Sequence, residues 1–215
     1  MMNINHVKDP WECYVFDNFL SPERWKEIRN LADIQLEKYY EWTNSPRKKV
    51  YKNKSYVSRD KYSCYVDEDI IPETNSLFHD YILPHRPYEG KLKKVVHWAI
   101  APPYWSYPAH CDNRARISTT ILYVGPEETD GTILHKNLSN NDNGDHEKAN
   151  MPSEYETEIK WEPNKAFFHN TIPNKTWHSI SNSTDKPRIT LNSFFVQENL
   201  VSKGREYTGH EIDIG

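Results

Sequence analysis

The second half of this chain consists of short strand-like segments separated by clusters of turn-forming residues. Runs rich in Val, Ile, Thr, Tyr, Phe and Trp alternate there with groups of Pro, Asn, Asp and Gly, a pattern typical of antiparallel strands joined by turns. The expected strands cover 95–100, 116–124, 132–134, 155–161, 166–169, 177–181 and 188–196. Such a series of short strands favours a barrel or a jelly roll.

Helical signals are confined to the first half of the chain. Ser21 can cap a helix whose first position is Pro22, and a second helix is expected over 72–81, ending before Pro84. Apolar residues recur at helical spacing in the first helix at Trp25, Ile28, Ala32, Leu36 and Tyr39. Helices followed by strands predict an α+β fold in which the helices pack outside an antiparallel barrel or jelly roll.

Length and charge narrow the class of protein. A chain of 215 residues suits one domain, and we expect N-terminal support at 1–92, a core at 93–198 and a tail at 199–215. The formal net charge of −4 and the pI near 6.2 provide no overall basic field, which argues against a general nucleic-acid-binding protein. The three cysteines follow no disulfide or zinc spacing. Without a signal-peptide pattern or an apolar run of roughly 20 residues, a cytoplasmic protein is expected.

Two segments have unusual local composition. Basic residues and two tyrosines dominate 47–61, which fits a solvated loop or edge strand, or alternatively a flap that faces the substrate. The polar stretch 137–153 is rich in turn formers, and its composition fits a lid and an inert surface loop equally well.

His110 and Asp112 are the first candidate metal ligands. Residues i and i+2 of an extended segment project to the same side, so the imidazole and the carboxylate can share one ion while Cys111 points away. Such a pair also arises by chance on a protein surface. The candidate third ligand is His178, on the predicted strand 177–181. Two imidazoles and one carboxylate leave three positions open on a six-coordinate ion, which suits non-haem Fe(II), whereas zinc prefers a tetrahedral site.

Arg188 begins the last predicted strand, ten residues after His178. Alternation places Arg188, Thr190, Asn192 and Phe194 on one face of that strand and apolar residues on the other. If the apolar face packs against the helices, Arg188 is a buried cation that needs an anionic partner, and a dicarboxylate would provide one. In strand 116–124, Ile117, Thr119, Ile121 and Tyr123 should share a face, so that Tyr123 reaches the same cavity. Taken alone, Arg188 and Tyr123 also fit a surface arginine and a core tyrosine.

Together these motifs resemble the 2-oxoglutarate/Fe(II) oxygenases and, within them, the prolyl 4-hydroxylase-like branch. The resemblance covers roughly 107–196 and consists of Tyr107 before His110, the His110 and Asp112 pair, the strand RISTTILYV, the turn DGTIL, and His178 followed by Arg188. The sequence departs from the family pattern at Thr132, where a second Gly is frequent, and at Arg188, where collagen-type enzymes have Lys.

The resemblance implies a double-stranded β-helix with His110, Asp112 and His178 as iron ligands. It further implies that Arg188 and Tyr123 hold the distal carboxylate of 2-oxoglutarate, with Tyr107 and Thr190 also near this co-substrate. The implied reaction hydroxylates an unactivated C–H bond and converts 2-oxoglutarate and O2 to succinate and CO2. A peptidyl proline, a free amino acid and another small metabolite all fit as substrate.

Two other functions use the same residues differently. A catalytically silent jelly-roll module that binds a sugar or peptide would not need Arg188 in register with His178. An AlkB-like nucleic-acid demethylase shares the iron centre, but that family carries a further arginine after Arg188, and 189–196 contains none. His97, His135, His146 and His169 form no comparable spacing set, and we expect His135 and His169 to be polar strand-end residues.

Overall fold

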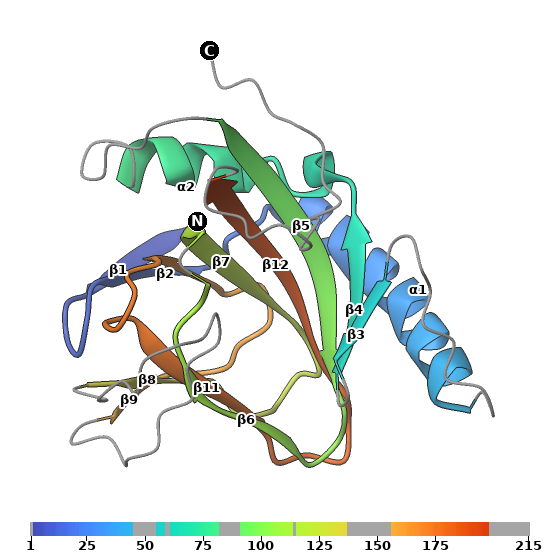
Figure 1. Ribbon diagram of the computed structural model, residues 1–215. Coiled ribbons are helices and arrows are strands. Elements are labelled where there is room, and N and C mark those ends of the chain that lie inside the picture. The colour runs from blue at the N-terminus through green and yellow to red at the C-terminus, as the bar shows by residue number, and fades with distance from the viewer. Residues whose placement is uncertain are drawn as a thin grey trace.

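Two antiparallel sheets and two α-helices make up the part of the chain that the computed structural model describes, residues 2–44, 55–58, 61–81, 91–113, 115–136 and 156–197. The larger sheet has eight strands in the order β1-β2-β10-β7-β12-β5-β4-β3, and the smaller sheet has four in the order β6-β11-β8-β9. In Figure 1 the smaller sheet lies below the larger one, and the helices lie on the other side of the larger sheet. The predicted α+β class with outer helices is confirmed.

The two sheets are formed by twelve strands in the described part of the chain. In the larger sheet they are β1 (Asn3–Val7), β2 (Cys13–Asp17), β3 (Ser55–Ser58), β4 (Lys61–Val66), β5 (Leu92–Ala101), β7 (Arg116–Gly125), β10 (Ala166–Asn170) and β12 (Arg188–Gln197). In the smaller sheet they are β6 (Trp105–His110), β8 (Thr132–His135), β9 (Glu156–Ile159) and β11 (Trp177–Asn182).

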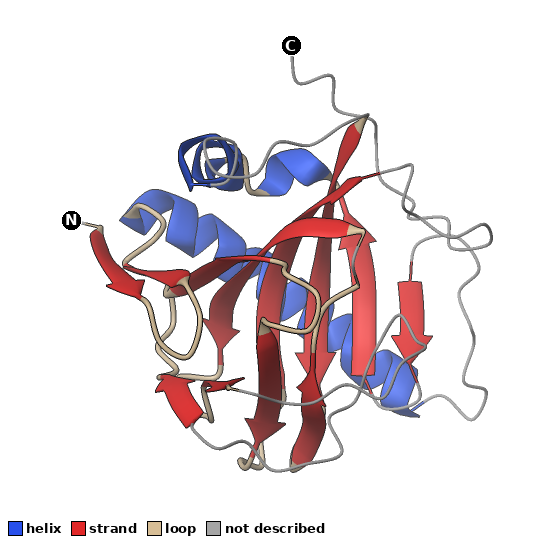
Figure 2. Cartoon of the chain, turned by 60° about the vertical axis from the view of Figure 1, so that its left-hand side comes forward, coloured by secondary structure: helices blue, strands red, loops and turns tan. Residues whose placement is uncertain are grey.

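The helices cover the outer face of the larger sheet. The first helix, α1 (Pro22–Asn44), starts where predicted, because the Ser21 hydroxyl accepts a hydrogen bond of 3.3 Å from the Arg24 backbone N–H. A short 3-10 helix, η1 (Glu68–Ile70), precedes α2 (Glu73–Tyr81). Figure 2 shows α1 running diagonally behind the strands. None of the helices in the described ranges is long and apolar enough to cross a membrane.

The central strand β12 divides the interior into two parts. Its outward side chains Ile189, Leu191 and Phe195 belong to the large core under the helices, where Phe195 stacks on Phe78 of α2 with ring centroids 4.1 Å apart. The inner face of the larger sheet packs against the smaller sheet through a second apolar cluster: Trp11, Cys13, Val15, Ile121, Tyr123, Leu134, Ile159 and Phe167. The alternation predicted for 188–196 is therefore confirmed.

The structure corrects several details of the predicted elements. Strands β1 to β4 and β6 were not predicted individually, and the strand expected over 155–161 is limited to Glu156–Ile159. Ile117 was assigned to the inner face, but it packs in the outer core. The reason is a register shift in the pairing of β7 with β12 between Phe195 and Val196, which reverses the alternation at the start of β7.

Most of the two segments of unusual composition lies outside the described residues. Within 47–61, the backbone of 55–58 forms the edge strand β3, which agrees with the edge-strand alternative. The polar stretch 137–153, Pro84, His146 and the tail 199–215 fall outside the described ranges.

Lys94 joins the outer face of β5 to the start of α2. Its side chain is 1% exposed, and its ammonium donates to the Ile71 carbonyl oxygen at 2.9 Å and to Asn75 Oδ1 at 2.8 Å. Burial lowers the pKa of Lys94 from 10.5 to about 8, although nearby acidic residues oppose the shift. The folded state thus loses this proton at a lower pH than the unfolded chain does.

We predict that Lys94 makes folding depend on pH in a defined window. The cost of burying the charge is fully present below pH 8 and is relieved as the pH rises from about 8 toward 10.5, because the unfolded chain then binds more protons than the folded one. Relative to Lys94→Met, the wild-type free energy of unfolding should therefore increase across this window by up to about 3 kcal/mol. Urea denaturation of both proteins at several pH values measures this difference, and a constant difference would contradict it.

Candidate metal and anion site

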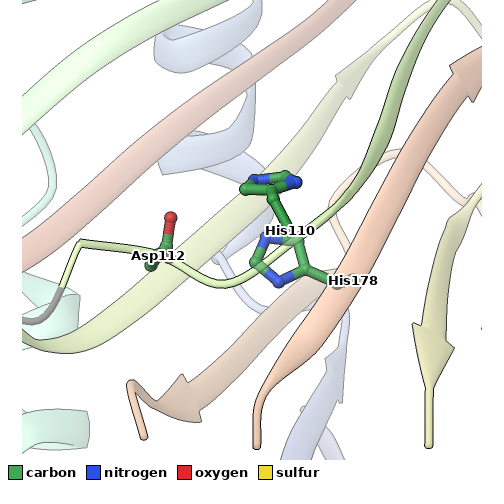
Figure 3. Close-up of side chains that lie close together, drawn as sticks. All are labelled: His110, Asp112 and His178. Carbon is green, nitrogen blue, oxygen red and sulfur yellow. The ribbon is translucent and has the colours of Figure 1, made fainter. Parts of the chain in front are cut away.

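Three side chains with metal-binding atoms meet at the end of the smaller sheet. His110 ends β6, Asp112 follows in the loop after it, and His178 lies on the neighbouring strand β11. The pairing of β6 with β11 places His178 opposite His110. One potential ligand atom from each of the three lies within 4.8 Å of the others, and all three residues are buried (Figure 3). Among the described residues this is the one group that could hold a metal ion.

The backbone fixes the orientation of both imidazoles. His110 Nδ1 lies 3.0 Å from the Pro108 carbonyl oxygen, and His178 Nδ1 lies 3.1 Å from the Thr176 carbonyl oxygen. A carbonyl oxygen only accepts hydrogen bonds, so each Nδ1 carries the proton and donates. This tautomer leaves the Nε2 lone pair of each ring available for a metal.

Asp112 is held as a carboxylate by two neighbouring donors. Arg116 donates to Asp112 Oδ1 at 2.5 Å, and the Thr119 hydroxyl donates to Oδ2 at 2.7 Å. Burial by itself raises the pKa of Asp112, but Arg116 and the nearby histidines outweigh burial and hold the pKa well below its usual range. The carboxylate is therefore ionised at neutral pH and ready to bind a cation.

Arg116 and Thr119 are contacts that the sequence alone did not identify as functional. Arg116 begins β7, and its guanidinium also lies 4.0 Å from the ring centroid of Phe194 on β12. Thr119 is on the inner face of β7, as its alternation with Tyr123 indicates. Arg116 follows Asp112 by four residues and Thr119 follows it by seven, and both contacts depend on how the short loop between β6 and β7 folds.

The donor set fits a divalent transition metal with open coordination positions. Two neutral imidazoles and one carboxylate on one side of an ion are the facial arrangement typical of non-haem Fe(II). The remaining positions would be free for other ligands. The outer contacts from Pro108, Thr176, Arg116 and Thr119 supply the supporting hydrogen bonds that such sites require.

Arg188 is a buried cation on the inner face of β12, in the larger sheet, whereas His110 and His178 lie on the smaller sheet. It is 3% exposed, and its Nε and one terminal nitrogen have no hydrogen-bond partner among the described residues. Its guanidinium carbon lies 4.7 Å from the ring centroid of Trp161 and 5.4 Å from that of Tyr123. Burial lowers the pKa of Arg188 to about 10, which still leaves it charged at neutral pH. A buried charge with unused donors is suited to binding an anion.

The other predicted co-substrate residues are divided between the two sheets, with Tyr123 and Thr190 on the larger sheet and Tyr107 on the smaller one. Tyr123 is fully buried beside Arg188, and its hydroxyl donates to Thr132 Oγ1 at 2.6 Å. Burial raises the pKa of Tyr123 to about 12, so the hydroxyl stays protonated. Thr190 is buried opposite Tyr123 in the strand pairing. Tyr107 lies at the metal end, with its ring edge-on to His110 at 4.5 Å.

The remaining described histidines do not belong to the metal group. His135 was expected at a strand end, and it does end β8, where Nε2 lies 2.8 Å from Ser179 Oγ. His169 also lies near a strand end, one residue before the end of β10, but it is completely buried, and its ring centroid lies 5.5 Å from that of His178. Burial lowers the pKa of His169 to about 4, so this ring is neutral. The structure thus adds a neutral neighbour behind one ligand.

Comparison with solved structures identifies the fold. The structure matches a Pseudomonas putida prolyl-4-hydroxylase with a TM-score of 0.56 and 14% identity, over 85% of this chain and 91% of that one. It matches a viral collagen prolyl hydroxylase from Paramecium Bursaria Chlorella virus-1, in a 2-oxoglutarate complex, with a TM-score of 0.57 and 15% identity, over 89% and 98% of the two chains. The epimerase SnoN, in complex with Fe3+, alpha-ketoglutarate and nogalamycin RO, matches with a TM-score of 0.56 and 13% identity over 94% and 91%.

This chain has the fold of the 2-oxoglutarate/Fe(II) oxygenases. The expected resemblance, including its prolyl hydroxylase-like branch, is confirmed at the level of fold. No protein-family model and no curated protein matches the sequence. The similarity is therefore shown at the level of the backbone, and the chemistry has to be argued from the side chains of the candidate site.

We predict that Arg116 supports metal binding through Asp112. The variant Arg116→Met keeps most of the side-chain volume but removes the donor to Asp112 Oδ1. We expect the affinity for Co(II), a stand-in for Fe(II) that resists oxidation, to fall roughly tenfold, as is typical when an outer contact to a ligand is lost. Isothermal titration calorimetry measures this affinity.

The matched control for Arg116 is Arg24→Met. Arg24 binds Glu73 and the Ile70 carbonyl oxygen under the helices and makes no contact with the metal group. Its variant should bind Co(II) like the wild type. Equal affinity in all three proteins, with unchanged melting temperature, would show that Arg116 does not support the ligand.

Proposed function

We propose that this protein is an Fe(II)- and 2-oxoglutarate-dependent dioxygenase that hydroxylates an unactivated C–H bond. The observation that carries the proposal is the combination of two features in the interior between the two sheets. The group His110, Asp112 and His178 fits iron, and Arg188 offers a buried cation with unused donors. A dicarboxylic acid that chelates a metal at one end needs both features, whereas a metal-binding module without a co-substrate needs only the first.

Each side chain has a defined task in this function. The Nδ1 hydrogen bonds of His110 and His178 hold both Nε2 atoms toward the ion. Asp112 adds a negative charge that offsets part of the positive charge of the metal. Arg188 neutralises the distal carboxylate of 2-oxoglutarate, and the planar guanidinium can donate two parallel hydrogen bonds to it. With both bound, the iron and the co-substrate supply the oxidising chemistry that converts 2-oxoglutarate and O2 to succinate and CO2.

Tyr123 supports Arg188 in the proposed site. Its ring stacks on Trp161 with centroids 4.5 Å apart, and the Arg188 guanidinium lies near both rings. These rings exclude water from the cation, so that its attraction for a carboxylate is stronger than at a surface. The protonated hydroxyl of Tyr123 donates to Thr132 Oγ1, and the same hydroxyl can donate to a carboxylate instead.

The primary substrate is a peptide or a small molecule. A prolyl residue is one candidate, because two of the matching structures are prolyl hydroxylases. A small molecule is equally compatible, because another matching structure is an epimerase in complex with nogalamycin RO. We also propose a double-stranded β-helix topology for the two facing sheets and a cytoplasmic location, which the three free cysteines suit.

The proposal predicts a spectroscopic and a chemical signal. Anaerobic addition of Fe(II) and 2-oxoglutarate should give a weak visible charge-transfer band, and admission of O2 should release succinate slowly even without primary substrate. In His110→Ala and Asp112→Ala we expect neither signal, with folding unchanged by circular dichroism. Arg188→Ala should chiefly raise the 2-oxoglutarate Kd, and Arg188→Lys should recover part of the affinity because it retains the charge but not the paired donors.

Other outcomes would favour a different function. Wild-type succinate release in His110→Ala would remove this residue from the metal site. Iron binding without any band would mean that the site does not hold 2-oxoglutarate, and a catalytically silent jelly-roll binding module would then be the better description. Tight duplex-DNA binding with a linear dependence on salt would instead support an AlkB-like demethylase.

A further inference from the structure

Asn192 is a second polar side chain with an unused atom on the inner face of β12. It lies four residues beyond Arg188 on the same face, opposite Ile121 of β7 and His97 of β5. Asn192 is 9% exposed, and its Oδ1 is buried without a hydrogen-bond partner among the described residues. Buried polar atoms in folded proteins nearly always have a partner, so an unused one next to a candidate site suggests that a ligand supplies it.

His97 holds the side-chain amide of Asn192 in place. The amide nitrogen lies 3.2 Å from His97 Nε2. The His97 ring packs against two other rings. Its centroid lies 5.3 Å from that of Phe194, which is edge-on, and 5.6 Å from that of Tyr65. A half-turn of the amide exchanges its C=O and NH2 ends. With His97 Nε2 donating to the amide oxygen, the NH2 group becomes the unused end and can donate to a ligand.

The strand register places Asn192 between the two ends of the candidate site. Arg188 lies at the start of β12, and Phe194, two residues beyond Asn192, is opposite Thr119, which donates to the metal ligand Asp112. Residues on a strand follow each other at about 3.3 Å, so the Cα atoms of Arg188 and Asn192 are about 13 Å apart, and the long Arg188 side chain covers part of this interval. A ligand that extends from Arg188 toward the metal group therefore passes Asn192 before it reaches the metal.

We propose that Asn192, oriented by His97, is a third contact for the co-substrate and donates to the carboxylate beside its keto group. This inference rests on the proposed function. Arg188 takes the distal carboxylate, and the position of Asn192 nearer the metal group assigns it to the other end of the molecule. A carboxylate only accepts hydrogen bonds, which matches the NH2 end of an amide whose oxygen is occupied by His97.

The test measures separately how each end of the co-substrate contributes to binding. The probes are 2-oxoglutarate and 2-oxopentanoate, which has the same keto acid end and carbon number but lacks the distal carboxylate. Each is titrated anaerobically into the Fe(II)-loaded full chain, and the Kd comes from the visible band, so no turnover is needed. Asn192→Ala should raise the Kd of both probes about tenfold, whereas Arg188→Ala should raise the Kd of 2-oxoglutarate alone.

Two further variants guard against a purely structural effect. His97→Phe retains a ring between Tyr65 and Phe194 but removes the hydrogen bond to Asn192. It should raise the Kd of both probes by about two- to fivefold. In the Asn192→Ala background it should cause no further rise in either Kd. Asn192→Leu fills a similar volume without hydrogen-bond donors, and its Kd values should equal those of Asn192→Ala. This variant therefore replaces Asn192→Ala if the alanine variant is unstable.

The outcomes distinguish this inference from the proposed function. Wild-type Kd values for both probes in Asn192→Ala and Asn192→Leu would overturn the contact. If the Asn192 variants bind 2-oxoglutarate more weakly but bind 2-oxopentanoate like the wild type, the assignment of Asn192 to the keto acid end would be overturned. If the wild type binds Fe(II) but gives no band with either probe, the proposed function fails and the inference with it, and that result is seen before any variant is made.

Discussion

The pairing of β11 with β6 is the constraint on which the candidate metal group depends. It places His178 opposite His110, with ring centroids 4.4 Å apart, although the two residues are far apart in the sequence. A slip of one residue would turn His178 to the other side of the smaller sheet, since side chains alternate along a strand. Asp112 lies close to both histidines because β6 ends at His110 and Asp112 follows two residues later in the loop.

The central strand β12 links the stability of the fold to the candidate site. Its outer residues anchor the helices, while Arg188 and Asn192 face inward, so packing on one side fixes positions on the other. The two buried charges of the candidate site, Asp112 and Arg188, differ in whether they have partners. Asp112 has its donors already in place, whereas Arg188 has unused donors. Buried charges are costly without a partner, and this difference is the reason that the site suits a cation at one end and an anion at the other.

The elements with the strongest periodic patterns were the ones that the sequence predicted most completely. Helix α1 and strands such as β7 and β12 have strong periodic patterns, because one or both of their faces are buried, and the sequence alone indicated them. Strands β1 to β4 and β6 were missed, and three of these five, β1, β3 and β6, lie at the edge of a sheet. Strand β6 contains Pro108, which weakens a strand prediction but is tolerated at an edge, where one side of the backbone needs no partner. Edge pairing depends on a neighbour that is distant in the sequence.

The sequence by itself determined the chemistry that this protein can offer: the His110, Asp112 and His178 donor set, the face of Arg188, and the order of helices and strands. Only the tertiary structure decided which side chains surround them. The contacts of Arg116 with Asp112, Trp161 with Arg188, and His97 with Asn192 join different strands or loops. Local spacing fixes the face on which a side chain lies, but the register between strands, set by packing of the whole core, fixes its neighbours.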